Sequence, residues 1–144
     1  MKRYASQNET RDVSRTFVAV LPTAPRVFGY YTLSNSLIST DVLPAIRAKK
    51  LARNPPVPTA LIGRLAVGRN AQGQRLGEFL LLDALARTER LSEQTGVHAV
   101  VVDAIDEQAR AFYLKYGFEV LLDDPPHLFI TLKVVRQLGL NMKN

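Results

Sequence analysis

The chain has 144 residues, 47% of them hydrophobic and 22% charged, which is enough for one globular domain with a buried core. It contains no cysteine, and this excludes disulfide bonds, thiolate zinc sites and cysteine nucleophiles. No apolar run approaches the roughly 20 residues of a membrane-spanning helix, and the polar N-terminus has no signal-peptide core. We therefore expect a single domain over residues 1–144, located in the cytoplasm and without a membrane partner.

The formal net charge of +6 arises in the first part of the chain. Residues 1–60 contain nine basic and three acidic residues, whereas the rest of the chain contains ten of each. Four of the basic residues lie close together, namely Arg47, Lys49, Lys50 and Arg53. A basic field attracts polyanions such as nucleic acids and phosphate-bearing cofactors. The alternative is that these basic residues form a solvated surface that only aids solubility. Composition does not decide between polyanion binding and solubility.

In chain order, the polar segment before Arg15 is interpreted as the end of a helix or a frayed arm. The β-branched and apolar runs at residues 16–21 and 28–33 predict two strands of an antiparallel hairpin. A short basic helix is predicted over residues 43–52. The proline-rich segment 54–58 that follows predicts an extended connector.

The second half alternates between strand and helix patterns. Strands are predicted at residues 61–67, 97–102, 118–121 and 128–132, and helices at 74–94 and 106–115. The strand at 97–102 is continuously hydrophobic, which is typical of a strand that is buried on both faces. This order predicts an α/β fold with a mixed central sheet flanked by helices.

The segment 64–78 joins the predicted strand at 61–67 to the N-terminus of the long helix. Backbone N–H groups at a helix start, with the helix dipole behind them, bind phosphate without needing a cation. Gly73 and Gly77 allow a ligand to approach the backbone closely. Two glycines alone are also compatible with an ordinary joint between a strand and a helix. The segment is neither a Walker loop nor a dinucleotide-binding G-x-G-x-x-G motif.

A second motif runs from Ala109 to Phe118 and reads Ala-x-x-Phe-Tyr-x-x-x-Gly-Phe. Together with Gln72-Gly73-Gln74-Arg75-Leu76-Gly77 it resembles the signatures of the GCN5-related N-acetyltransferases (GNAT superfamily), over residues 15–133. The resemblance implies the GNAT fold and acetyl-CoA as cofactor. One departure is Arg75, which occupies the place of a glycine, and we expect it to keep ordinary helical dihedrals.

The resemblance also implies a role for particular residues. The strand edge at Leu65, Ala66 and Val67 would pair with the pantetheine amides, and the loop at residues 72–77 would hold the pyrophosphate. Tyr113 would protonate the departing coenzyme A thiolate, since a phenol and a thiolate have comparable basicity. The alternative for Tyr113 is core packing on a short amphipathic helix. The residues expected to bind the cofactor are Leu65, Ala66, Val67, Gln72, Gly73, Gln74, Arg75, Leu76 and Gly77.

A narrower resemblance, to the acetyltransferase toxins of type II toxin–antitoxin systems, rests on the segments 14–18, 29–34, 63–67 and 101–104, together with Pro58. It implies acetylation of the α-amino group of aminoacyl-tRNA, inhibition of translation and a ribbon–helix–helix antitoxin as partner. Arg47, Lys49, Lys50 and Arg53 would then contact tRNA phosphates. Members of this family usually begin with a further strand and helix, and residues 2–7 resemble the last turns of that helix.

Two other functions stay open on the same fold. One is acetylation of a small-molecule amine, because a fold does not fix its substrate. The other is a non-catalytic relict that binds coenzyme A or an antitoxin. A homodimer and a monomer are both compatible with the sequence.

Outside these motifs, four polar residues are candidates for chemical roles. His98 and His127 stand alone, so we expect no metal site. Asp103 is a candidate to hold a base or a water molecule, whereas Asp106 is expected to cap the helix that follows it.

Overall fold

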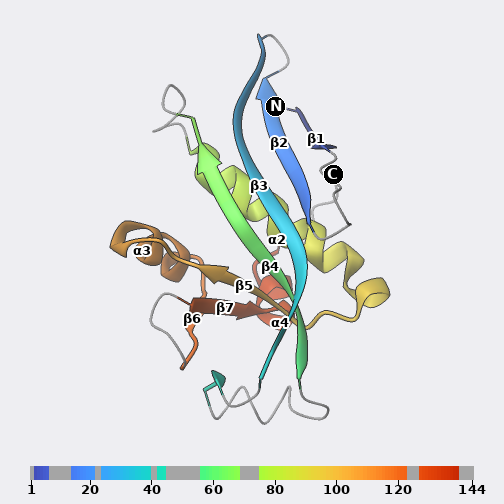
Figure 1. Cartoon of the computed structure of the whole chain (residues 1–144), viewed down its shortest axis with the longest axis vertical. Helices are drawn as coiled ribbons and strands as arrows, with labels where there is room; N and C mark the ends of the chain where they lie inside the picture. The colour runs from blue at the N-terminus through green and yellow to red at the C-terminus, as the bar shows by residue number, and fades with distance from the viewer. Residues whose placement is uncertain are drawn as a thin grey trace.

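The computed structural model describes residues 2–6, 14–21, 24–39, 42–44, 56–68, 75–122 and 127–139. Within these ranges the chain forms a sheet of seven strands in the order β1-β2-β3-β4-β5-β7-β6 (Figure 1). The strands are β1 (Lys2–Ser6), β2 (Arg15–Leu21), β3 (Ala24–Ile38), β4 (Val57–Val67), β5 (Ala99–Asp103), β6 (Glu119–Val120) and β7 (His127–Thr131). The helices are α2 (Leu76–Thr95), α3 (Glu107–Lys115) and α4 (Leu132–Gln137).

Strands β1 to β4 are antiparallel neighbours, and β4 pairs with β5 in parallel, so the sheet is mixed as predicted. The predicted hairpin at residues 16–21 and 28–33 is confirmed as β2 and β3. On β2 the side chains of Phe17 and Ala19 are buried, whereas Val18 between them is only half-buried. This alternation is the period of two that a half-covered strand requires.

The prediction for the N-terminal residues was wrong. Instead of the last turns of a helix, Lys2–Ser6 form the edge strand β1, antiparallel to β2, with Lys2 opposite Val20 and Ser6 opposite Thr16. The physical reason is that β2 would otherwise present a row of unpaired backbone groups at the sheet edge. A five-residue segment gains more from that pairing than from one isolated helical turn.

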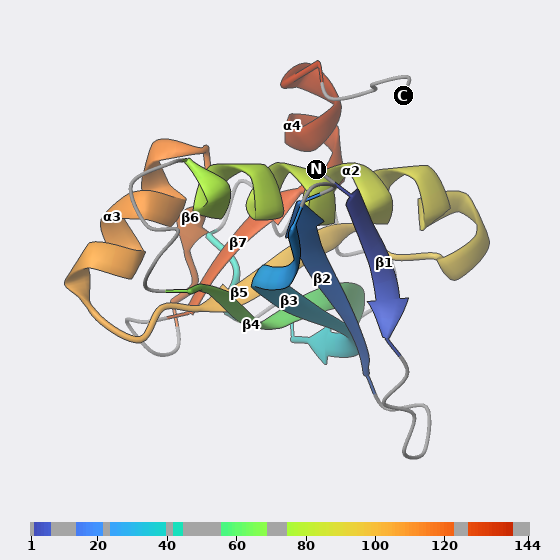
Figure 2. The same ribbon diagram turned by 90° about the horizontal axis from the view of Figure 1, so that it is seen from above.

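The helices pack over one face of the sheet (Figure 2). Leu80, Leu81, Ala84 and Leu85 of α2 are almost completely buried against that face. On the β5 and β7 side, the same core is formed by Val100, Val102, Leu128 and Ile130. Val101 and Phe129 point to the opposite face, where they form a smaller cluster with Leu43, Val57 and Leu121. We call the part of this opposite face that is formed by β2, β3 and β4 the open face.

Helix boundaries follow local chemistry. Helix α2 ends at Thr95, because Gly96 adopts a left-handed conformation (φ 74°) and its N–H bonds to the Ser92 carbonyl. The strand predicted at 128–132 ends one residue early, since the Thr131 hydroxyl accepts the N–H of Val134 at 3.3 Å and starts α4. Helix α4 was not predicted. The helix expected at 43–52 lies almost entirely outside the described residues.

No helix in the described ranges is long and apolar enough to cross a membrane.

Candidate active site

The candidate site is a cleft between β4 and β5. These strands pair only from Thr59 opposite Ala99 to Ile62 opposite Val102. Beyond Ile62 they separate, and a cavity of about 430 Å³ opens between them. Its lining includes Arg64, Leu65, Ala66, Asp103, Ile105 and Tyr113. The separation exposes one edge of β4 to the cleft, and such an edge can bind an extended ligand as an added strand.

A bulge at Gly63 accompanies the separation. The register of β3 and β4 shifts here, with Thr32 opposite Arg64 but Leu33 opposite Ile62, so that Gly63 is the extra residue. The N–H of Arg64 bonds to the Thr32 hydroxyl at 3.0 Å. A Cβ on Gly63 would lie only 2.8 Å from that hydroxyl oxygen, so the bulge needs glycine.

The N-terminus of α2 lies at the upper end of β4, where the sequence predicts the phosphate loop (Figure 1). Of the predicted loop residues, Gln72, Gly73 and Gln74 lie outside the described residues. Helix α2 begins without a side-chain cap, so its first N–H groups are available for an anion. The Leu76 side chain is buried in the core, which leaves only its backbone for a ligand.

Arg75 does not have the helical dihedrals expected from the sequence. Its φ is 60° and its ψ is 24°, which is the left-handed conformation. The motif that this segment resembles has a glycine at this place, which suits a chain that turns into α2 through positive φ. Arginine bears a strain of about 1 kcal/mol there. Its exposed side chain forms an ion pair with Glu78 at 3.4 Å.

Tyr113 lines the cleft from α3. Its ring packs against Phe112 and Phe118, each with a centroid distance of 5.3 Å, so part of its role is core packing. The residue nevertheless lines the cleft, and its hydroxyl has no hydrogen-bond partner among the described residues. Burial raises the pKa of Tyr113 to about 12, so the phenol keeps its proton and remains a donor at neutral pH.

Sequence reasoning missed a link between α3 and the start of α2. Tyr116 is hydrogen-bonded to Glu78, and burial together with this bond raises the pKa of Tyr116. Its ring also contacts Phe112, with a centroid distance of 5.3 Å. Glu78 and Tyr116 lie far apart in the sequence, and no local pattern signals this tertiary contact.

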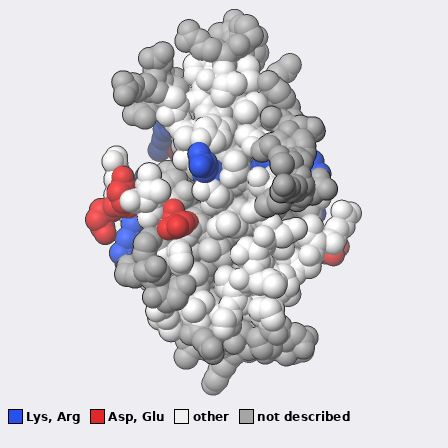
Figure 3. All heavy atoms as spheres, in the orientation of Figure 1, with Lys and Arg blue, Asp and Glu red and all other residues white. Residues whose placement is uncertain are grey.

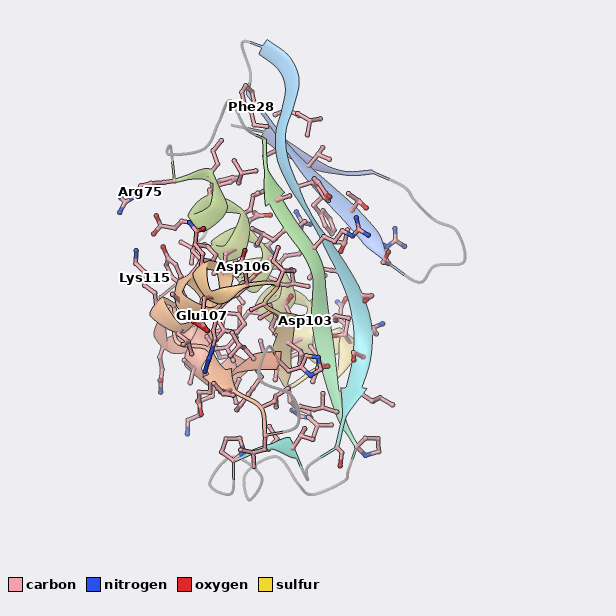
Figure 4. The ribbon with its side chains drawn as sticks, turned by 60° about the vertical axis from the view of Figure 1, so that its left-hand side comes forward. Phe28, Arg75, Asp103, Asp106, Glu107 and Lys115 are labelled. Carbon is pink, nitrogen blue, oxygen red and sulfur yellow. The ribbon has the colours of Figure 1, made fainter. Side chains whose placement is uncertain are left out.

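Other predicted residues have mixed outcomes. Asp106 caps α3 as expected, with its carboxylate accepting the N–H of Ala109 at 2.8 Å (Figure 4). Leu65 and Ala66 line the cleft, and Val67 packs against the main core. The basic residues Arg47, Lys49, Lys50 and Arg53 lie outside the described residues. Arg64 and Ile105, which were not predicted as site residues, belong to the cleft.

The profile of the acetyltransferase (GNAT) domain matches residues 14–120. The chain belongs to the GNAT acetyltransferase family. It is therefore an N-acetyltransferase, and the cofactor of this chemistry is acetyl-CoA. A cleft with an exposed strand edge, an uncapped helix start and a protonated tyrosine fits that cofactor.

Three similar proteins illustrate the relationship. The chain is 36% identical over 140 residues to the tRNA-acetylating toxin of Mycobacterium tuberculosis, covering 96% of this chain and 81% of that protein. It resembles AtaT complexed with acetyl-methionyl-tRNAfMet, with a TM-score of 0.80 and 30% identity over 88% of this chain and 76% of that one. It also resembles AtaTR bound with acetyl-CoA, with a TM-score of 0.74 and 32% identity over 88% of this chain and 75% of that one.

Proposed function

We propose that this protein transfers the acetyl group of acetyl-CoA to the α-amino group of aminoacyl-tRNA and so inhibits translation as a toxin. The observation that carries the proposal is the cleft between β4 and β5, lined by Tyr113, in a chain similar over nearly its whole length to a tRNA-acetylating toxin. Such a substrate places the protein in the cytoplasm.

Each part of the cleft has a role in this reaction. The edge at Leu65, Ala66 and Val67 would hold the pantetheine arm by backbone hydrogen bonds, as an added strand would. The start of α2, with the loop at residues 72–77, would hold the pyrophosphate through N–H groups and the helix dipole. Acetyl-CoA supplies the acetyl group as a reactive thioester. Tyr113 donates its proton to the departing sulfur, which needs a neutral phenol.

The acceptor is held by charge. Arg47, Lys49, Lys50 and Arg53 supply positive charge for the tRNA backbone, and phosphate contacts of this kind need no sequence code. A toxin of this kind is inactivated by an antitoxin, for which we propose a ribbon–helix–helix protein.

The test is to incubate the protein with labelled acetyl-CoA and total charged tRNA, and to count label in the tRNA fraction. Deacylated tRNA is the acceptor control, since it lacks the α-amino group. Label in charged tRNA alone supports the proposal. Label in small amines but not in tRNA would favour a small-molecule acetyltransferase, and coenzyme A binding without any transfer would favour a non-catalytic relict.

A further inference from the structure

Two polar side chains lie side by side where β5 ends at the cleft, one on β5 and one on the neighbouring strand β7. Asp103 is the last residue of β5 and His127 is the first of β7, and the two are direct cross-strand partners. The His127 Nε2 lies 3.9 Å from the Asp103 Oδ2. Val101 and Phe129, two residues away on each strand, point away from the helices. By strand alternation, Asp103 and His127 therefore point away from the helices as well.

Asp103 belongs to the same cleft as Tyr113. Both residues line it, one from the end of β5 and the other from α3. Figure 4 shows Asp103 between α3 and the long strands β3 and β4. The Asp103 side chain is 60% exposed, so it is accessible to a ligand without rearrangement. No structural role within the described residues accounts for Asp103 beyond its contact with His127.

The surroundings of Asp103 are suited to an amino acid. Ile105 is 89% exposed and lines the same cleft, so an apolar side chain stands close to the carboxylate. Figure 3 shows acidic side chains together with basic ones at one edge of the face it presents, a further acidic side chain at the opposite edge, and a largely uncharged middle. A carboxylate beside an apolar surface matches an α-ammonium group beside an amino-acid side chain.

We infer that Asp103 binds the α-ammonium group of the acceptor and accepts its proton, and that His127, at 3.9 Å, positions Asp103. The inference rests on the proposed function. An α-amino group has a pKa near 8, so at neutral pH most of it is the ammonium form, which has no lone pair for attack.

The proton balance of the step is complete. The ammonium gives one proton to Asp103, and the freed nitrogen lone pair forms a bond to the acetyl carbonyl carbon. The bond from that carbon to sulfur breaks, and the sulfur takes the proton of Tyr113. The nitrogen then loses its second proton, which restores the phenol through solvent. The Asp103 side chain is 60% exposed and gives its proton to bulk water, so the net products are an amide, a thiol and one proton.

Other titratable groups line the cleft with Asp103 or lie on the same face of the sheet as His127. Arg64 of β4, Tyr30 of β3 and Tyr113 of α3 line the same cleft. Glu119 of β6 is paired with Phe129 of β7. Phe129 and His127 are two residues apart on β7, so their side chains lie on the same face of the sheet. These residues are unchanged in every variant below, so differences in pH profile between variants report on Asp103 and His127.

The experiment compares Asp103→Asn, Asp103→Glu and His127→Gln with wild type at pH 6 to 8.5. Charged tRNA and an α-amino acid methyl ester serve as acceptors. Glu93→Gln is the matched control, because it removes one negative charge from an exposed position on α2. Coenzyme A affinity and melting temperature are measured for each variant, and we expect both to stay at wild-type values.

We expect Asp103→Asn to lower kcat/KM about 100-fold at pH 7 on both acceptors. Its remaining rate should rise about tenfold per pH unit below pH 8, as the free amine fraction rises. Asp103→Glu should restore part of the rate, and His127→Gln should lower it less than Asp103→Asn. A purely structural residue would show no recovery with pH.

The inference is overturned if Asp103→Asn matches Glu93→Gln on both acceptors, or if its loss is the same at every pH. Wild type that acetylates the ester but not charged tRNA overturns the proposed function instead. In that case the rates measured with the methyl ester still test the role of Asp103. If no acceptor is acetylated by wild type, both proposals fall.

Discussion

Replacing Gly77 with alanine should change stability and cofactor affinity in opposite directions. Gly77 lies in the first turn of α2, and a Cβ there would meet Phe112 Cζ and Val67 Cγ2 at 3.9 Å, which is ordinary van der Waals contact. The fold therefore accepts a methyl group. Alanine is favoured over glycine in a helix by up to about 1 kcal/mol, which is worth roughly 3 °C in melting temperature at this chain length.

The same methyl group stands where we propose that the pyrophosphate approaches the helix start. A hydrogen bond to a charged group contributes about 1.5–3 kcal/mol, so losing one should weaken coenzyme A binding by about 10- to 100-fold. Gly77→Glu should weaken binding further, because it adds a negative charge as well as bulk. Calorimetry with coenzyme A and thermal unfolding measure the two effects on one protein sample.

Gly96→Ala is the matched control, at the other end of the same helix. Gly96 has a φ of 74°, and a Cβ at this position would have nothing within 4 Å, so alanine there costs about 1 kcal/mol of strain without a clash. It should lower the melting temperature and leave coenzyme A affinity unchanged. The reasoning is refuted if Gly77→Ala binds coenzyme A as wild type does, since the helix start would then not be a close approach for the cofactor.

Three further predictions concern the tyrosines and the basic segment. Tyr113→Phe should lower turnover by about 10²- to 10⁴-fold with unchanged coenzyme A affinity; a loss of only a few-fold would leave Tyr113 with packing alone. Lys49→Ala/Lys50→Ala should reduce the slope of log affinity for charged tRNA against log salt by about two, with no loss on a small amine; equal losses on both acceptors would make the segment structural. Burial raises the pKa values of Tyr31 and Tyr113 above the unfolded value near 10, so both residues stabilise the fold fully below pH 10. Above pH 10 this stability should fall by up to about 1.4 kcal/mol per pH unit for each tyrosine, and urea unfolding of Tyr113→Phe should show a shallower decline than wild type.

Much of the site was predictable because its parts are local. The motif from Ala109 to Phe118 combines a helix period with a glycine stop, and it correctly placed Tyr113 on a short helix. The strand pattern at 61–67 likewise lies within β4. These features depend on the spacing of apolar residues, which the sequence contains in full.

The features that were missed depend on tertiary context. Arginine rarely adopts positive φ, so the conformation of Arg75 follows from the path of the chain into α2 and not from its own preference. The pairing of β1 depends on the open edge of β2, and no local pattern within residues 2–6 reveals that edge. The short helix α4 requires the cap at Thr131 as well as the burial of Leu132 and Val135.

Hydrogen bonds join Tyr31 of β3 to Asp83 and Arg87 of α2. The Tyr31 hydroxyl donates to Asp83 at 2.5 Å and accepts from Arg87 Nε at 3.1 Å. Arg87 also lies 4.0 Å from the centre of the Phe17 ring. These contacts fasten β2 and β3 to α2, so the helix whose start is proposed to hold the pyrophosphate is fixed to the sheet that borders the cleft.

A single local feature connects the two halves of the proposed reaction. The bulge at Gly63 lets Ile62 and Leu65, three residues apart, both face the α2 core, which changes the path of β4 where β5 no longer follows it. Because the ladder stops at Ile62 and Val102, the next residue of β5, Asp103, reaches the cleft instead of being covered by β4. The same separation therefore exposes a strand edge for the cofactor and a carboxylate for the acceptor amine, with Tyr113 lining the space between them.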